Sequence, residues 1–159
     1  MKKSCAFSVV EIIVAAAIIV SVVTAAAAAW QIYIRTLNSS TLQSQASMIT
    51  EETSEVLRAF RDQSWTTYIA PLTLGTTYQL DWNGTGYTIT TNQKLIQSKF
   101  VRTFVISLVN RDASDNVVAA PSGTPDTNTK KVTISVFLVG ATSTPTMQTE
   151  MLLHNVYAN

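Results

Sequence analysis

The feature that most constrains this chain is an apolar segment, residues 12–34, that contains no charged side chain. As a helix that rises about 1.5 Å per residue, it is long enough to cross the roughly 30 Å hydrocarbon core of a bilayer. A helix packed on a soluble domain would carry a polar face. This segment has only four polar residues, which are Ser21, Thr24, Gln31 and Tyr33. The sequence therefore predicts a membrane-inserted helix near the N-terminus.

Three interpretations of the first thirty residues compete. A Sec signal peptide would use the basic start, the apolar middle and the small residues at 25–29 as a cleavage site. A signal anchor would use Lys2 and Lys3 to hold the N-terminus in the cytoplasm. Neither of these two gives a role to Glu11, a carboxylate at the head of the apolar segment.

The third interpretation rests on a resemblance to the class III leader of type IV prepilins and type II secretion pseudopilins. The matching features are a short basic leader at residues 1–6, then Phe7, three mostly apolar residues, Glu11 and an unbroken apolar stretch. These families usually have Gly where this chain has Ala6. The resemblance implies that a prepilin peptidase cleaves between Ala6 and Phe7 on the cytoplasmic side and N-methylates Phe7.

Glu11 has a physical reason to need a partner. A carboxylate at the end of a membrane helix costs about 1–3 kcal/mol, rising with depth, and buried charges are normally paired. In the filament that the resemblance implies, the partner is the N-terminal amine of Phe7 in a neighbouring subunit. That amine exists only after the leader is removed, so processing and assembly are coupled. The alternative is an interfacial Glu11 that faces water beside the lipid headgroups.

The helix is predicted to continue past the membrane, from about residue 7 to about residue 62. No Pro occurs before Pro71 and no Gly before Gly75, so nothing breaks it at the interface. Beyond Arg35, small and apolar residues recur at steps of four and three on one helical face, and Leu57 widens it. We expect this face to pack on a globular head; an independent coiled coil is the alternative, although the pattern is short for one. The face consists of Leu42, Ala46, Ile49, Thr53, Val56 and Phe60.

From Ser64 onward the pattern is that of β-strands, and Asn83-Gly84 between two of them indicates a hairpin turn. The expected fold class is α+β: a long N-terminal helix whose C-terminal half packs on a small antiparallel sheet. Strands are expected at 77–82, 87–91, 100–109, 131–139 and 148–157. The corresponding domains are a cleaved leader at 1–6, a transmembrane and filament-core helix at 7–35, an amphipathic extension at 36–63 and a β-sheet head at 64–159.

Residues 111–129 are rich in Asp, Ser, Pro, Gly and Asn and predict a long surface loop. With the strand that follows, the loop is similar to the C-terminal part of certain minor pilins and pseudopilins, in which an acidic loop leads into a Lys-x-Val-x-Val strand. Some pseudopilins bind Ca²⁺ in such a loop, and Asp112, Asp115 and Asp126 could supply oxygen ligands. No Asp-x-Asp-x-Asp-Gly spacing is present, so we expect neither a metal nor a cofactor.

Catalytic and nucleic-acid-binding functions are not predicted. No G-x-S-x-G, P-loop, Rossmann or H-E-x-x-H motif occurs. The single histidine, His154, lies in an apolar context and is expected to be packed or at a strand edge. Net charge is +1 with no basic stripe, which argues against binding phosphate backbones. With Cys5 alone, no disulfide can form within the chain, so a minor pilin or pseudopilin is favoured over a disulfide-looped major pilin.

The sequence thus predicts a structural subunit and not an enzyme: a minor pilin or pseudopilin of a type IV pilus or a type II secretion-like filament. It is expected in the inner membrane as a single-pass protein with its head outside the cytoplasm, and then in a cell-surface or periplasmic filament. The resemblance implies as partners a prepilin peptidase, an inner-membrane platform with an assembly ATPase, other pilin subunits and membrane lipid. The alternative is a bitopic membrane-anchored or secreted binding module with no filament role.

Overall fold

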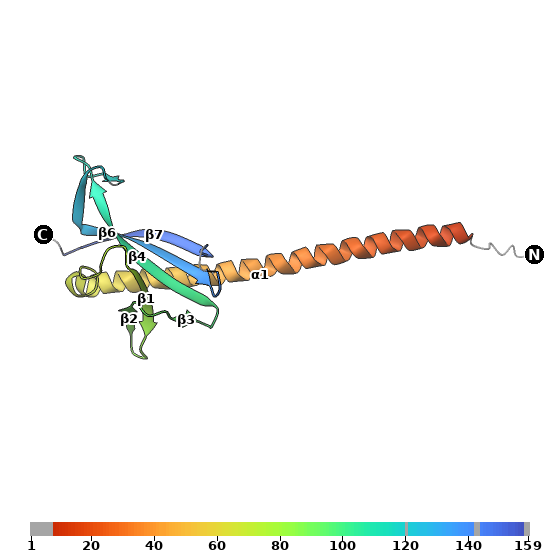
Figure 1. The fold of residues 1–159 in the computed structure, drawn as a ribbon, viewed down its shortest axis with the longest axis horizontal. Helices are drawn as coiled ribbons and strands as arrows, with labels where there is room; N and C mark the ends of the chain where they lie inside the picture. Colours follow the sequence, from red (N-terminus) through yellow and green to blue (C-terminus); the bar gives the residue numbers. More distant parts are fainter. Residues whose placement is uncertain (1–7, 120, 142–143, 158–159) are drawn as a thin grey trace, which may run out of the picture. The chain divides into compact units, whose positions relative to one another are not determined.

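The computed structural model describes residues 8–119, 121–141 and 144–157. The chain divides into two compact units, Met1–Thr41 and Leu42–Asn159, which are described in turn. One long helix, α1 (Val9–Tyr68), provides the helical residues of both, and every strand belongs to the second unit (Figure 1). The fold is α+β, with a long N-terminal apolar helix and an antiparallel sheet, as the sequence predicts.

The first unit consists of the N-terminal half of α1. Each residue from 8 to 41 is solvent-exposed, including the isoleucines and valines of the apolar segment. A helix that is apolar all round is characteristic of a buried or membrane-spanning position. By length and composition, α1 contains one segment able to cross a membrane.

The helix is interrupted at Ser64, whose φ of −170° and ψ of 107° are not helical. Its hydroxyl accepts a hydrogen bond from the backbone N–H of Thr67 at 3.3 Å, which is how a serine caps the start of a helical turn. The last turn therefore starts afresh and carries Trp65 into the core. The predicted end at about residue 62 lies next to this break.

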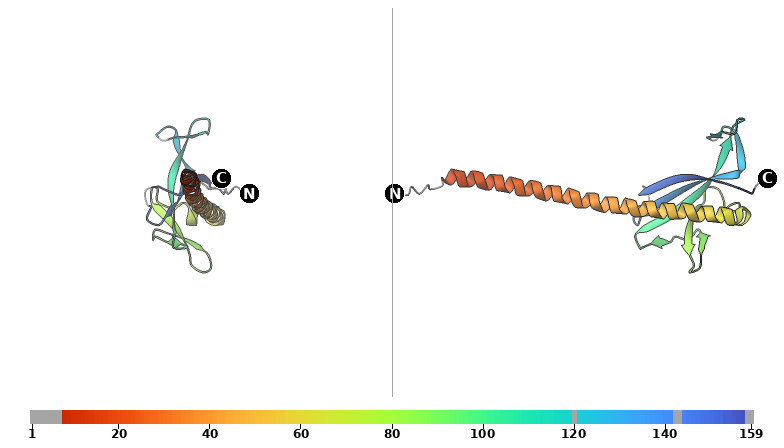
Figure 2. Two further views of the ribbon diagram at one scale, coloured as in Figure 1. Left: turned by 90° about the vertical axis from the view of Figure 1, so that its right-hand side faces the viewer. Right: turned by 180° about the vertical axis from the view of Figure 1, so that it is seen from behind.

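The second unit contains a sheet in the order β2-β1-β4-β6-β7, with antiparallel neighbours throughout. The two short strands β3 and β5 pair with β4 at either end. In the views of Figure 2, the sheet lies along one side of the C-terminal half of α1. The strands are β1 (Thr77–Trp82), β2 (Tyr87–Thr90), β3 (Leu95–Ile96), β4 (Phe100–Arg111), β5 (Val117–Val118), β6 (Thr124–Leu138) and β7 (Met147–His154).

The core forms where the predicted apolar face of α1 meets the inward-facing residues of β4 and β6. Of that face, four residues are buried and Leu42 and Val56 are partly buried; Leu57 is also fully buried. The strand predicted at 131–139 is confirmed as the second half of β6, where the inward-facing Val132, Ile134 and Val136 are inaccessible to solvent and alternate with partly exposed residues. The largest fully buried side chains are Phe100, Phe104, Leu57, Ile69, Ile106, Ile134 and Leu153.

The predicted hairpin turn is confirmed between β1 and β2. Trp82 pairs with Tyr87 across it, and the N–H of Asn83 donates to the carbonyl of Gly86 at 3.1 Å. The Asn83 side-chain oxygen accepts from the backbone N–H groups of Thr85 and Gly86. Gly84 has a φ of +97°, a conformation that glycine adopts without steric cost.

The prediction of one long loop at 111–129 is wrong. β4 extends to Arg111, β5 pairs with its end, and β6 begins at Thr124, so this segment forms a ribbon that extends the sheet (Figure 1). The first residues of β6 carry no apolar alternation, and they include Pro125. Both features argue against a strand. They are held instead by pairing with β4 and by polar side-chain contacts, which sequence periodicity does not report.

Candidate functional site

The first candidate site is the start of α1. Ala6 and Phe7, the predicted cleavage and methylation site, lie outside the described residues. Glu11 lies in the first turn, and its N–H donates to the carbonyl of Ser8 at 3.0 Å. A carboxylate is favoured there because the N-terminal end of a helix carries a partial positive charge. Glu11 is exposed and is the only charged residue between positions 8 and 34.

The hydroxyl groups of Ser21 and Thr24 in the apolar segment are satisfied within the helix. Ser21 donates to the carbonyl of Ala17 at 2.8 Å, and Thr24 donates to that of Val20 at 2.9 Å. Such bonds remove the need for water, which matters because an unsatisfied polar group in hydrocarbon costs several kcal/mol, on the order of a lost hydrogen bond. The outer surface of residues 12–30 is therefore compatible with lipid or with other apolar helices.

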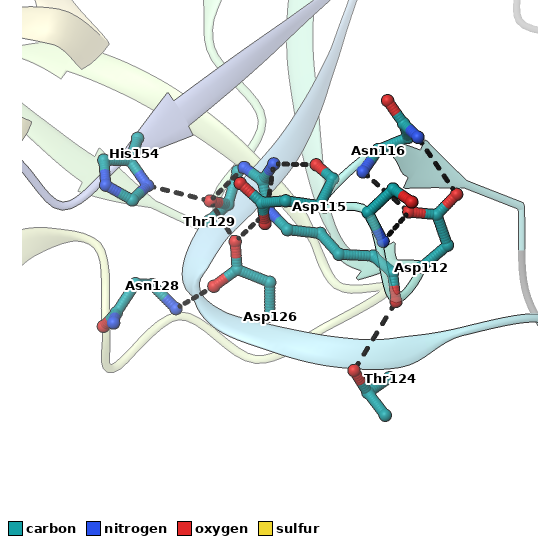
Figure 3. A network of polar contacts seen from close by, with 10 residues as sticks. Asp112, Asp115, Asn116, Thr124, Asp126, Asn128, Thr129 and His154 are labelled. Atoms are coloured by element: carbon teal, nitrogen blue, oxygen red, sulfur yellow. Dashed lines mark hydrogen bonds and ion pairs between the residues drawn. The ribbon is translucent and has the colours of Figure 1, made fainter.

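The second candidate site is the set of three aspartates proposed as weak calcium ligands. The structure gives Asp115 and Asp126 a common partner, Arg111, and gives Asp112 different partners in Ser114 and Asn116 (Figure 3). Asp126 accepts from Arg111 Nε at 2.7 Å, and the Asp115 carboxylate lies 3.6 Å from Arg111 Nη1. Asp112 accepts from the N–H groups of Ser114 and Asn116, each at 2.9 Å. These bonds to Asn116 and Ser114 lower the pKa of Asp112.

No group of three or more His, Cys, Asp or Glu side chains arranged to hold a metal ion occurs among the residues that the structure describes. The guanidinium of Arg111 takes the place between Asp115 and Asp126 that a cation would need. The ribbon also depends on Gly123, which has a φ of +74°, because a Cβ atom there would overlap the carbonyl oxygen of Arg111. The geometry thus assigns these residues to holding the ribbon on the sheet.

A chain of hydrogen bonds joins this ribbon to the edge strand β7. The Thr129 hydroxyl donates to Asp126 Oδ2 at 2.5 Å and lies 2.9 Å from Nδ1 of His154 (Figure 3). Because the hydroxyl has a single proton, Nδ1 of His154 is the donor in the second bond. His154 is expected from the sequence either to be packed or to lie at a strand edge. It is exposed and lies at the end of the edge strand β7.

This constellation does not activate a nucleophile. In a serine or threonine hydrolase the imidazole accepts the hydroxyl proton, whereas here the hydroxyl donates a hydrogen bond to Asp126 and accepts one from the imidazole. Thr129 is also 1% exposed, so no substrate reaches its oxygen. The arrangement is that of a structural clamp.

Asp126 is expected to make the head sensitive to acid. The hydrogen bonds from Thr129 and Arg111 lower the pKa of Asp126 to about 2, below the roughly 3.9 of an unfolded aspartate. The folded state therefore binds fewer protons, and this stabilisation is complete above pH 4 and lost as the pH falls through 2. Asp126→Asn should lower stability by about 1–2 kcal/mol at pH 7 and by progressively less below pH 4.

Melting temperatures of the wild type and the Asp126→Asn variant, measured from pH 7 to pH 2, test this. Asp115→Asn is the control, because the Asp115 side chain is far more exposed than that of Asp126 and its loss should cost less at pH 7. A constant difference between wild type and Asp126→Asn over the whole pH range would contradict the role given to the Asp126 carboxylate.

Sequence reasoning missed an ion pair between helix and sheet in which the arginine is buried and the glutamate is partly exposed. Arg102 occupies an inward-facing position of β4, between Phe100 and Phe104, and its side chain is only 5% exposed. Its Nη1 lies 3.4 Å from Oε1 of Glu52 on α1, and its Nη2 donates to the carbonyl of Leu80 at 3.3 Å. A charged residue at an inward position of an alternating strand is the signal that could have revealed it.

The hydroxyl of Tyr87 also donates to Glu52, and the Tyr87 ring lies 5.5 Å from the guanidinium carbon of Arg102. The bond to Glu52, with burial adding to it, raises the pKa of Tyr87. Two donors of Arg102, Nε and Nη1, are buried and have no hydrogen-bond acceptor in the described part of the chain. The neighbouring Glu51 is exposed and takes no part in this ion pair.

Comparison with known proteins gives no relative: the chain matches no family model, no curated protein and no solved structure.

Proposed function

We propose that this protein is a structural subunit, a minor pilin or pseudopilin, of a type IV pilus or a type II secretion-like filament. The observation that carries the proposal is the first half of α1, whose apolar side chains are exposed all round with Glu11 as the single charge at its head. Such a surface needs an apolar environment. A membrane supplies it before assembly, and the helices of other subunits supply it afterwards.

The fold of the second unit supports the same proposal. The C-terminal half of α1 is not free but forms one core with the sheet, and every residue of that core belongs to the second unit. In the filament that we propose, this unit would be the head of the subunit.

The mechanism that we propose couples processing to assembly. A prepilin peptidase would remove residues 1–6 on the cytoplasmic side and leave Phe7 as a methylated amine. The amine would pair with Glu11 of a neighbouring subunit, with an inner-membrane platform and its ATPase driving insertion. The head would face outward, and no catalytic step by the subunit itself is required.

The N-terminus of the mature protein tests the proposal. Mass spectrometry of the protein from membranes should show a chain that begins with N-methylated Phe7. An intact Met1 would instead indicate a signal anchor, and a start at Ala27 or later would indicate Sec cleavage and a secreted head. An Ala6→Leu variant, which removes the small residue before the proposed cut, is the control and should remain unprocessed.

A further inference from the structure

The β1–β2 hairpin, the short strand β3 and one turn of α1 enclose a pocket of about 370 Å³ in the second unit. This volume lies within the roughly 300–1,000 Å³ of small-molecule sites. All the residues that line the pocket belong to the second unit, whereas the assembly that we propose rests on the apolar segment of the first unit. Its walls differ in character: two aromatic rings lie on one side and two ion pairs lie around them.

The aromatic wall consists of Trp82 and Tyr87. Their ring centroids are 5.1 Å apart with an interplanar angle of 66°, an edge-to-face pair across the hairpin. Trp82 nevertheless remains 56% exposed. A tryptophan ring held by a neighbouring aromatic side chain and still open to solvent offers a flat apolar surface whose face carries partial negative charge.

The polar wall consists of two oppositely charged pairs. Lys94 Nζ lies 2.8 Å from Oδ2 of Asp81, and the buried Arg102 forms an ion pair with Glu52. The pocket therefore has no net charge. Each carboxylate can still accept further hydrogen bonds, and the Lys94 ammonium can still donate. The backbone N–H of Lys94 is fixed by Gln79 at 2.7 Å, so this part of the wall is positioned in advance.

We propose that this pocket binds a neutral sugar ring, stacked on Trp82 with its hydroxyl groups on Asp81, Lys94 and Glu52. The C–H face of a sugar is weakly positive and apolar, which matches the face of the indole. Hydroxyl groups both donate and accept, which matches a wall of paired acids and bases. An anion would meet two carboxylates and two cations that are already paired with them, so it would gain no net attraction. A purely apolar ligand would strip water from both ion pairs without replacing it.

Titration of the full chain in a detergent without a sugar headgroup tests the proposal. The probes are the methyl glycosides of glucose, galactose, mannose and N-acetylglucosamine, and the signal is the indole N–H resonance of each tryptophan. At least one probe should shift the Trp82 resonance with a dissociation constant on the order of 1 mM, while the resonance of Trp65, which is buried in the core, stays unchanged. Glucuronate and inorganic phosphate are the anionic comparison.

Two variants and a control make the result specific. Calorimetry measures the affinity for the glycoside that shifts the Trp82 resonance. Trp82→Ala should abolish this binding, and Lys94→Ala should weaken it about tenfold while leaving the buried core unchanged. Tyr157→Ala removes an exposed aromatic residue outside the pocket and should leave the affinity unchanged. The proposal is overturned if none of the four glycosides shifts Trp82, if Lys94→Ala binds as well as wild type, or if the anions bind more tightly than the neutral sugars. None of these outcomes depends on filament assembly.

Discussion

Replacement of Glu52 by glutamine is expected to lower the free energy of unfolding of the head by about 3 kcal/mol. The Arg102 side chain is 5% exposed and that of Glu52 is 43% exposed, with 3.4 Å between Nη1 and Oε1. Arginine cannot lose its proton in a protein, so the buried guanidinium stays charged when its carboxylate partner is removed. The contacts of Arg102 with Leu80 and the Tyr87 ring remain, which keeps the cost at the lower end of the range for a broken buried pair.

The opposite substitution should have a much smaller effect. Arg102→Met replaces the buried charge with a flexible apolar side chain between Phe100 and Phe104. Glu52 is then left without its cation, but water reaches it and Tyr87 still donates to it. We expect a change within about 1 kcal/mol in either direction, because exchange of a buried ion for an apolar group is often neutral or stabilising.

Urea unfolding of the full chain in detergent, followed by the circular dichroism of the sheet, measures this asymmetry. The midpoint for Glu52→Gln should fall by about 1–3 M for a chain of this size, and Arg102→Met in addition should restore most of the loss. Glu51→Gln is the matched control, since Glu51 is the exposed neighbour on the same helical turn, and should stay within about 0.5 kcal/mol. Equal losses in Glu52→Gln and Glu51→Gln would contradict a role for the ion pair.

The parts of the fold that could be predicted from the sequence are those in which apolar residues recur at a regular local spacing. The helical face through Ala46, Ile49 and Thr53 repeats at steps of three and four, and β6 alternates through Val132 and Ile134; all five residues are buried. The hairpin at Asn83 could be predicted because its turn chemistry is contained within a few adjacent residues.

The parts that could not be predicted depend on contacts between distant segments. Arg102 and Glu52 are far apart in sequence, and only the packing of α1 on β4 brings them together. The start of β6 at Thr124 is fixed by pairing with Arg111 across a register shift after Leu108, not by any apolar pattern. A composition rich in Asp, Ser and Pro suggested a loop there, but the side chains of Asp126 and Thr129 are used to bind the ribbon to the sheet.

The candidate site at the N-terminus differs from the head in this respect. The site is proposed from a resemblance to prepilin leaders, whose basic leader, aromatic residue and carboxylate are matched within the first eleven positions. The structure adds that Glu11 lies in the first turn of a helix whose flanks are exposed and apolar.

Replacement of Glu11 by alanine or by glutamine is expected to reduce filament assembly at least tenfold. Loss of a charge pair in an apolar environment that is worth about 1.4 kcal/mol or more reduces an association constant by that factor, and Glu11 is the only charge in this part of the helix. Glutamine keeps the size of the side chain and removes its charge, so it separates electrostatic pairing with the Phe7 amine from packing. The head does not contain Glu11 and should unfold at the wild-type midpoint.

Filaments sheared from cells, quantified relative to the processed subunit in the membrane, measure the effect of Glu11 on assembly separately from its effect on cleavage. Ser21→Ala is the matched control, because the Ser21 hydroxyl bonds to the carbonyl of Ala17 within its own helix and its loss should leave assembly unchanged. If Glu11→Gln assembles as well as wild type, the carboxylate faces water at the membrane surface and the pairing is wrong. If both glutamine and alanine variants fail while Ser21→Ala succeeds, the charge at the head of an otherwise apolar helix is what distinguishes an assembling subunit from a membrane anchor.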